Sequence, residues 1–125
     1  MSVLKQFENQ QFINIETFRK NGQGVKTPVW FAREDDILYV WTGASSGKIK
    51  RIRNNPNVKI APAKPNGTPL EDWVAAKAST DESPEAMRHI IKLMRKKYGF
   101  SYTMFQLMGM LRREKYTSLR IQVTG

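Results

Sequence analysis

The chain has 125 residues, of which 40% are hydrophobic, and a formal net charge of +10, so one compact domain with an anionic partner is expected. It contains no cysteine, which excludes disulfides, thiolate metal sites and a cysteine nucleophile. No apolar run is long enough to span a membrane, and residues 1–7 lack the apolar core of a signal peptide. We therefore expect a cytoplasmic protein without a membrane partner, organised as a single domain over residues 1–125.

Six segments alternate apolar and polar residues between turn sequences, which predicts β-strands. In chain order, the predicted strands span residues 12–18, 25–31, 37–42, 58–62, 72–79 and 116–123. Short polar turns at residues 21–24 and 34–36 predict that the first three strands form an antiparallel meander. Pro28 cannot donate a ladder hydrogen bond, so the second strand should lie at an edge, a bulge or a gap in pairing. Its neighbours could then bond a planar ligand, or Pro28 could simply protect an edge strand from aggregation.

Three helices are predicted between these strands. A short one spans residues 47–54, and the prolines and asparagines that follow end it. A second begins after Ser83, which is typical of an N-cap, with Pro84 in its first turn, and ends at Gly99. A third spans residues 103–112. The order of elements predicts a mainly β (α+β) fold: an antiparallel β-barrel of about six strands with flanking helices.

The segment from Thr42 to Pro56 combines small, hydroxyl and glycine residues with a group of cations. Small residues let the backbone approach an anion, and the Ser46 hydroxyl, the Lys48 ammonium and a helix N-terminus can all bind one phosphate. The segment is not a Walker P-loop, because Ile49 occupies the position of the metal-binding hydroxyl. The sequence therefore predicts an anion site after the third strand.

Catalytic side chains are harder to find. His89 is the single histidine, and we expect no carboxylate to orient it, so no residue is assigned as a catalytic acid, base or nucleophile, and no metal site is predicted. An enzyme with so few candidate groups would take its chemistry from a cofactor. A basic barrel could instead bind nucleic acid. This alternative is less favoured, because the aromatic residues lie in β segments among aliphatic neighbours, where burial is expected.

Four motifs together resemble the flavin-binding split barrel of the pyridoxamine 5′-phosphate oxidase superfamily. They are Val25-Lys26-Thr27-Pro28-Val29-Trp30-Phe31, Leu38-Tyr39-Val40-Trp41-Thr42, Ser46-Gly47-Lys48 and Arg51-Ile52-Arg53-Asn54-Asn55-Pro56. The segment Arg95-Lys96-Lys97-Tyr98-Gly99-Phe100 is similar to the branch of small coenzyme F420 (deazaflavin)-dependent oxidoreductases. The resemblance covers residues 12–123 and implies the fold known as the FMN-binding split barrel.

The resemblance also implies a homodimer with the cofactor in a groove between the two chains. By motif, one strand would flank the cofactor ring through Lys26, Thr27, Pro28, Val29, Trp30 and Phe31. Trp41 and Thr42 would follow on the adjacent strand. Ser46 and Lys48 would hold the phosphate, and Lys50 and Arg51 could assist with the phosphate or with an acidic cofactor tail.

The implied function is an oxidoreductase that transfers hydride between coenzyme F420 or FMN and an unknown small organic acceptor. Gly47 stands where the vitamin-converting oxidase has an arginine, which argues against oxidation of pyridoxamine phosphate. The cations beyond the phosphate motif favour the deazaflavin, whose tail is acidic, over FMN. A cofactor-binding or carrier module without turnover remains an alternative.

Overall fold

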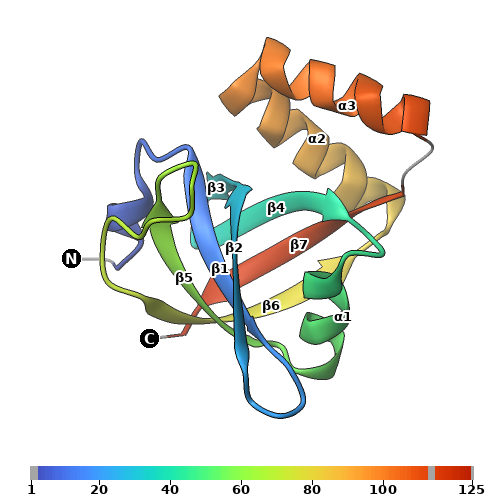
Figure 1. Ribbon diagram of the computed structural model, residues 1–125. Helices are drawn as coiled ribbons and strands as arrows, with labels where there is room; N and C mark the ends of the chain where they lie inside the picture. Colours follow the sequence, from blue (N-terminus) through green and yellow to red (C-terminus); the bar gives the residue numbers. More distant parts are fainter. Residues whose placement is uncertain (1–2, 113–114, 125) are drawn as a thin grey trace.

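The computed structural model describes residues 3–112 and 115–124, which form one antiparallel sheet with helices around it (Figure 1). The strands are β1 (Phe12–Phe18), β2 (Gly24–Trp30), β3 (Ala32–Glu34), β4 (Ile37–Gly43), β5 (Asn57–Ala63), β6 (Val74–Asp81) and β7 (Tyr116–Val123). The helices are a 3₁₀-helix η1 (Val3–Phe7) and the α-helices α1 (Gly47–Asn54), α2 (Pro84–Tyr98) and α3 (Phe100–Arg112). The predicted class, an antiparallel split barrel with flanking helices, is confirmed.

The sheet has the strand order β2-β1-β5-β6-β7-β4-β3, and all its neighbouring strands run antiparallel. It curls so that the β2 edge comes back toward β4, with a seam between them (Figure 1). Because β2 pairs with β1 alone in this order, it is an edge strand. Of the three positions predicted for Pro28 (an edge, a bulge or a gap in pairing), the structure has the edge.

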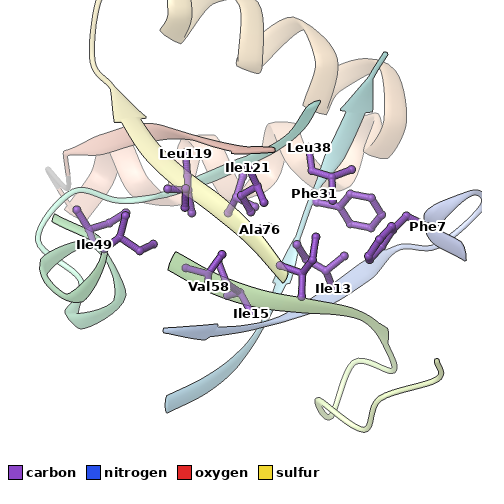
Figure 2. Close-up of a cluster of buried hydrophobic side chains, with 14 residues drawn as sticks. Phe7, Ile13, Ile15, Phe31, Leu38, Ile49, Val58, Ala76, Leu119 and Ile121 are labelled. Atoms are coloured by element: carbon purple, nitrogen blue, oxygen red, sulfur yellow. The ribbon is translucent and has the colours of Figure 1, made fainter. Parts of the chain in front are cut away.

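The inner face of the curled sheet encloses the main hydrophobic core (Figure 2). Side chains from β1, β4, β5, β6 and β7 alternate into it, as in β4, where Leu38 and Val40 are buried. Ile49 of α1 closes one end of the core, and Phe7 packs edge-on against Phe31 at the other, with ring centroids 6.2 Å apart (Figure 2). Each fully buried side chain of this kind stabilises the fold by about 1.5–3 kcal/mol.

Two features of the predicted sheet are wrong. The first three predicted strands do not form a meander, because β4 pairs with β7 and β3 and not with β2. The sheet also has seven strands, not six. The additional strand, β3, was not predicted, because its three residues are too few to show alternation. Phe31 lies between β2 and β3, where the chain passes from one edge of the sheet to the other, and its side chain is buried in the core.

The predicted start and end of α2 are confirmed. The Ser83 hydroxyl accepts a hydrogen bond from the Ala86 N–H at 3.2 Å, and Gly99 ends the helix with a φ of 58°, which favours glycine. Helix α3 starts at Phe100, three residues before its predicted start, because Gly99 is the only residue between the two helices. Predicted strand boundaries are correct to within two residues.

Helices α2 and α3 cover the outer face of the sheet beside β4. Ile90 and Met94 of α2 pack with Ala32 and with Tyr102 of α3 in a second, smaller cluster of buried side chains. Within residues 3–112 and 115–124, no helix combines the length and the apolar composition needed to cross a membrane.

Candidate functional site

A cleft of about 220 Å³ lies across the seam between β2 and β4. It is lined by Phe12, Pro28, Val29, Trp30, Trp41 and Met94. Four of these residues, Pro28, Val29, Trp30 and Trp41, are among the predicted site residues, so the structure brings together the two strand motifs that are separate in the sequence. The lining is apolar, and the unpaired side of an edge strand such as β2 offers backbone groups for hydrogen bonds.

Strand alternation divides the β2 motif between two faces. Pro28 and Trp30 lie in register with Asn14 and Phe12, on the outer face of the sheet. Val29 packs against the barrel core, Thr27 shares its face, and Phe31 is fully buried. The side chains of Pro28 and Trp30 can therefore contact a ligand in the cleft, whereas Thr27 could contribute only backbone groups. The backbone N–H and carbonyl of Phe31 are already bonded to side chains of α2.

The β4 motif is divided in the same way. Thr42 is buried, while Trp41 lies half-buried on the outer face of the strand. The Trp41 ring stacks on Tyr116, with centroids 3.9 Å apart, and meets the Tyr102 ring edge-on at 4.9 Å. These contacts fix the Trp41 side of the cleft.

Tyr98, at the last turn of α2, fixes the Trp30 side. Its ring stacks on Trp30 at 4.4 Å, and its hydroxyl oxygen accepts from the Phe31 N–H at 2.9 Å. The same hydroxyl lies 2.6 Å from the carbonyl oxygens of Phe31 and Gln11. Burial raises the pKa of Tyr98, so the hydroxyl stays protonated and donates to a carbonyl. Sequence reasoning missed this role, because the only local signal is an aromatic residue on the apolar face of a predicted helix.

Lys97 holds the same backbone segment from the other side. Its Nζ donates to the Phe31 carbonyl at 2.7 Å and lies 3.5 Å from the centroid of the Phe31 ring. Burial lowers the pKa of Lys97 to about 8. Lys97 and Tyr98 therefore fix the end of β2 where the cleft begins.

The predicted anion site lies at the N-terminus of α1, in the loop that follows β4. Ser46 is the N-cap of α1 but makes no capping bond, and its buried Oγ has no hydrogen-bond partner within residues 3–112 and 115–124. Burial, and next the nearby charge of Arg51, lower the pKa of Lys48. Arg51 Nε donates to Thr17 Oγ1 at 2.6 Å. A β-carbon on Gly47 would lie 2.9 Å from Arg51 Nη1, so the guanidinium covers this turn.

These groups favour an anion. Among the described residues neither Lys48 nor Arg51 forms a salt bridge, and the first turn of α1 contains no acidic residue. Lys48, Arg51 and the positive end of the α1 dipole repel one another, and a bound phosphate would offset that repulsion.

Two predicted residues lie apart from the cleft and the loop. Lys26, on the outer face of β2, has its Nζ 5.4 Å from the centroid of the Trp73 ring. Lys50 is exposed on α1, and neither residue lines the cleft. Both could contact only a ligand that extends beyond the cleft and the loop.

The expectation that no carboxylate orients His89 is wrong. His89 Nε2 lies 2.8 Å from Glu34 Oε1, and the Tyr39 ring meets the imidazole edge-on. The turn between β3 and β4 places Glu34 against α2, a contact between residues 55 positions apart that no local pattern predicts. The pair is exposed to solvent and does not line the cleft between β2 and β4.

Comparison of the sequence with protein-family models finds no match, and no curated protein matches it. Solved structures do match. The heme storage protein HutZ from Vibrio cholerae has 14% identity and a TM-score of 0.73, over 98% of this chain and 88% of that chain. An FAD-binding protein from Mesorhizobium loti has 16% identity and a TM-score of 0.64, over 100% of this chain and 90% of that chain.

An F420 reductase matches with 13% identity and a TM-score of 0.64, over 100% of this chain and 95% of that chain. At such low identity these similarities concern the fold. The named ligands include flavin-type cofactors and heme, so the fold alone does not select one of them. The chain has the split-barrel fold that these proteins share, as the resemblance of its motifs predicted.

Proposed function

We propose that this chain binds a flavin-type cofactor and acts as an oxidoreductase that transfers hydride between the cofactor and a small organic acceptor. The observation that carries the proposal is the buried, unpartnered Ser46 Oγ beside Lys48 and Arg51 at the start of α1. Leaving a buried hydroxyl without a partner costs about 1–3 kcal/mol, which a phosphate oxygen would offset.

The cofactor ring would lie in the cleft across the seam. Trp30 and Trp41 would contact it from β2 and β4, and backbone groups of the β2 edge around Pro28 would bond its polar rim. The anion loop follows β4 directly, so ring and phosphate would lie along one continuous strand and loop. When bound, such a cofactor supplies hydride transfer; this chain's residues hold it, orient it and exclude water.

A second copy of the chain would complete the site. The cleft of about 220 Å³ is smaller than the pockets of roughly 300–1,000 Å³ that enclose most small ligands. We therefore propose a homodimer in which the partner covers the open side of the cleft. Sedimentation velocity at micromolar concentration should show the mass of two chains.

We favour coenzyme F420 over FMN. Lys50 and Lys26 are exposed beyond the loop and the cleft, where they could contact an acidic cofactor tail that FMN lacks. Heme is less well supported, because the single histidine of the sequence, His89, pairs with Glu34 and does not line the cleft.

Fluorescence titration with F420 and with FMN tests the proposal. We expect at least one to bind at micromolar concentration, with F420 tighter. Lys48→Ala should weaken binding about 10- to 100-fold, the value of one hydrogen bond to a charged group. Lys59→Ala, which removes an exposed cation of β5, is the matched control and should leave affinity unchanged.

Failure of both cofactors to bind, or equal effects of the two lysine variants, would contradict the proposed site. Turnover separates an enzyme from a carrier module. The reduced cofactor should be oxidised in the presence of at least one member of a panel of electrophilic acceptors. Binding without any turnover would favour the carrier.

A further inference from the structure

The outer face of α3 is apolar, although it faces solvent. Five large hydrophobic side chains are exposed in the described part of the chain, and four of them lie on α3. They are Phe100, Met104, Leu107 and Met108, with exposed fractions of 78%, 43%, 50% and 44%. Their spacing places them on one side of the helix, opposite the fully buried Tyr102. We call these four residues the α3 apolar face.

Exposed cations lie on the neighbouring helix α2. Residues 86–112 contain six Lys and Arg and no Asp or Glu. Arg88, Lys92, Arg95 and Lys96 are exposed on α2, on the side away from the buried Ile90 and Met94. Arg95 Nη2 donates to Gln106 Oε1 of α3 at 2.8 Å. Gln106 follows Tyr102 by four residues, so this bond lies on the side of α3 that faces α2, and the cations flank α3 without lying on its apolar face.

We propose that the α3 apolar face and the cations of α2 dock on the surface of an anionic lipid bilayer. Apolar side chains on one side of a helix, with Lys and Arg beside them, are the pattern of helices that lie in a membrane interface. This contact requires no membrane-spanning segment, so it is compatible with the length and composition of the helices in the described part of the chain. It departs from the expectation, made from the sequence, that the protein has no membrane partner.

Shape and charge favour a lipid surface over other occupants. Helix α3 is the outermost element on its side of the molecule (Figure 1). The exposed side chains of an outermost helix form a convex surface. A fluid bilayer accommodates a convex helix, whereas a protein partner would need a matching groove. A second copy paired face to face would bring two sets of like charges together, which costs free energy. The proposed docking does not depend on which cofactor occupies the cleft.

Flotation with lipid vesicles tests the proposal. The full chain should float with vesicles of phosphatidylcholine containing 30% phosphatidylglycerol, a composition chosen for the assay, and remain unbound with phosphatidylcholine alone. Phe100→Ser should weaken binding about tenfold or more, because the ring is the most exposed apolar group of the face. Met104→Ser should also weaken it, while Leu70→Ser is the matched control with the same exposed fraction of 43%.

The cation contribution is measured separately, without a change in α3. Lys92→Gln should weaken binding about fivefold, the effect of one cation near an anionic surface, and Lys59→Gln should have no effect. This pair keeps the test valid if Phe100→Ser fails to fold. The proposal is overturned if the chain does not bind the anionic vesicles, or binds both compositions equally. It is also overturned if Leu70→Ser matches Met104→Ser, or if Phe100→Ser converts a dimer to a monomer without lipid.

Discussion

Removing the hydroxyl of Tyr98 should lower the free energy of unfolding substantially, although the substitution deletes only one oxygen atom. In Tyr98→Phe the ring that stacks on Trp30 is kept, but the Phe31 N–H loses its acceptor at 2.9 Å. The Phe31 carbonyl keeps the Lys97 Nζ donor at 2.7 Å, and the Gln11 carbonyl belongs to an exposed residue, so the cost falls mainly on the buried Phe31 N–H. A buried backbone group left without a partner costs about 1–3 kcal/mol, so we expect a loss of about 2 kcal/mol of unfolding free energy.

Tyr102→Phe is the matched control. The Tyr102 hydroxyl is buried without a hydrogen-bond partner in the described part of the chain, and its ring also contacts a tryptophan of the cleft, meeting Trp41 edge-on at 4.9 Å. Its removal should leave stability unchanged or raise it, because an unsatisfied polar group is lost. Urea unfolding followed by tryptophan fluorescence measures both variants. With a slope of about 2 kcal/mol/M, Tyr98→Phe should lower the midpoint by about 1 M. Equal midpoints for the two variants would refute the reasoning.

Three further predictions use the same unfolding assay or the cofactor titration. The pKa of Lys97 is lowered from 10.5 to about 8 in the folded chain. Between these pH values the lysine is protonated in the unfolded chain but largely neutral in the folded one, so the free energy of unfolding should rise with pH from about 8 to 10.5. Lys97→Met should remove that part of the rise, and an unchanged pH profile would contradict the assignment. Ser83→Ala should cost about 1 kcal/mol, whereas Ser46→Ala, whose side chain makes no capping bond, should leave stability intact and weaken cofactor binding. Gly47→Ala should displace the Arg51 guanidinium and weaken cofactor binding without unfolding the chain; unchanged affinity would exclude Arg51 from the site.

Local sequence determined most of the elements. The N-cap and proline before α2, and the alternation in β1, β4 and β7, depend on neighbouring residues, so their predicted positions are correct or nearly so. The one strand that was missed, β3, has three residues, too few for an alternating pattern. Strand partners were predicted less well, because pairing depends on residues far apart in the chain: β4 pairs with β7 across more than 70 positions.

The candidate site likewise has features that follow from local sequence and features that depend on long-range packing. The sequence by itself predicted an anion-binding loop after β4, because glycine, serine and lysine suit that role locally. It also limited the Pro28 strand to an edge, a bulge or a gap in pairing, because proline cannot donate a ladder hydrogen bond. Only the tertiary structure decided that the two motifs face each other across a seam, since that requires the curl of the whole sheet. It also revealed Tyr98 and Lys97, whose polar groups hold the end of β2 from a helix that begins more than 50 residues later. Such contacts depend on long-range packing, which no local pattern in the sequence encodes.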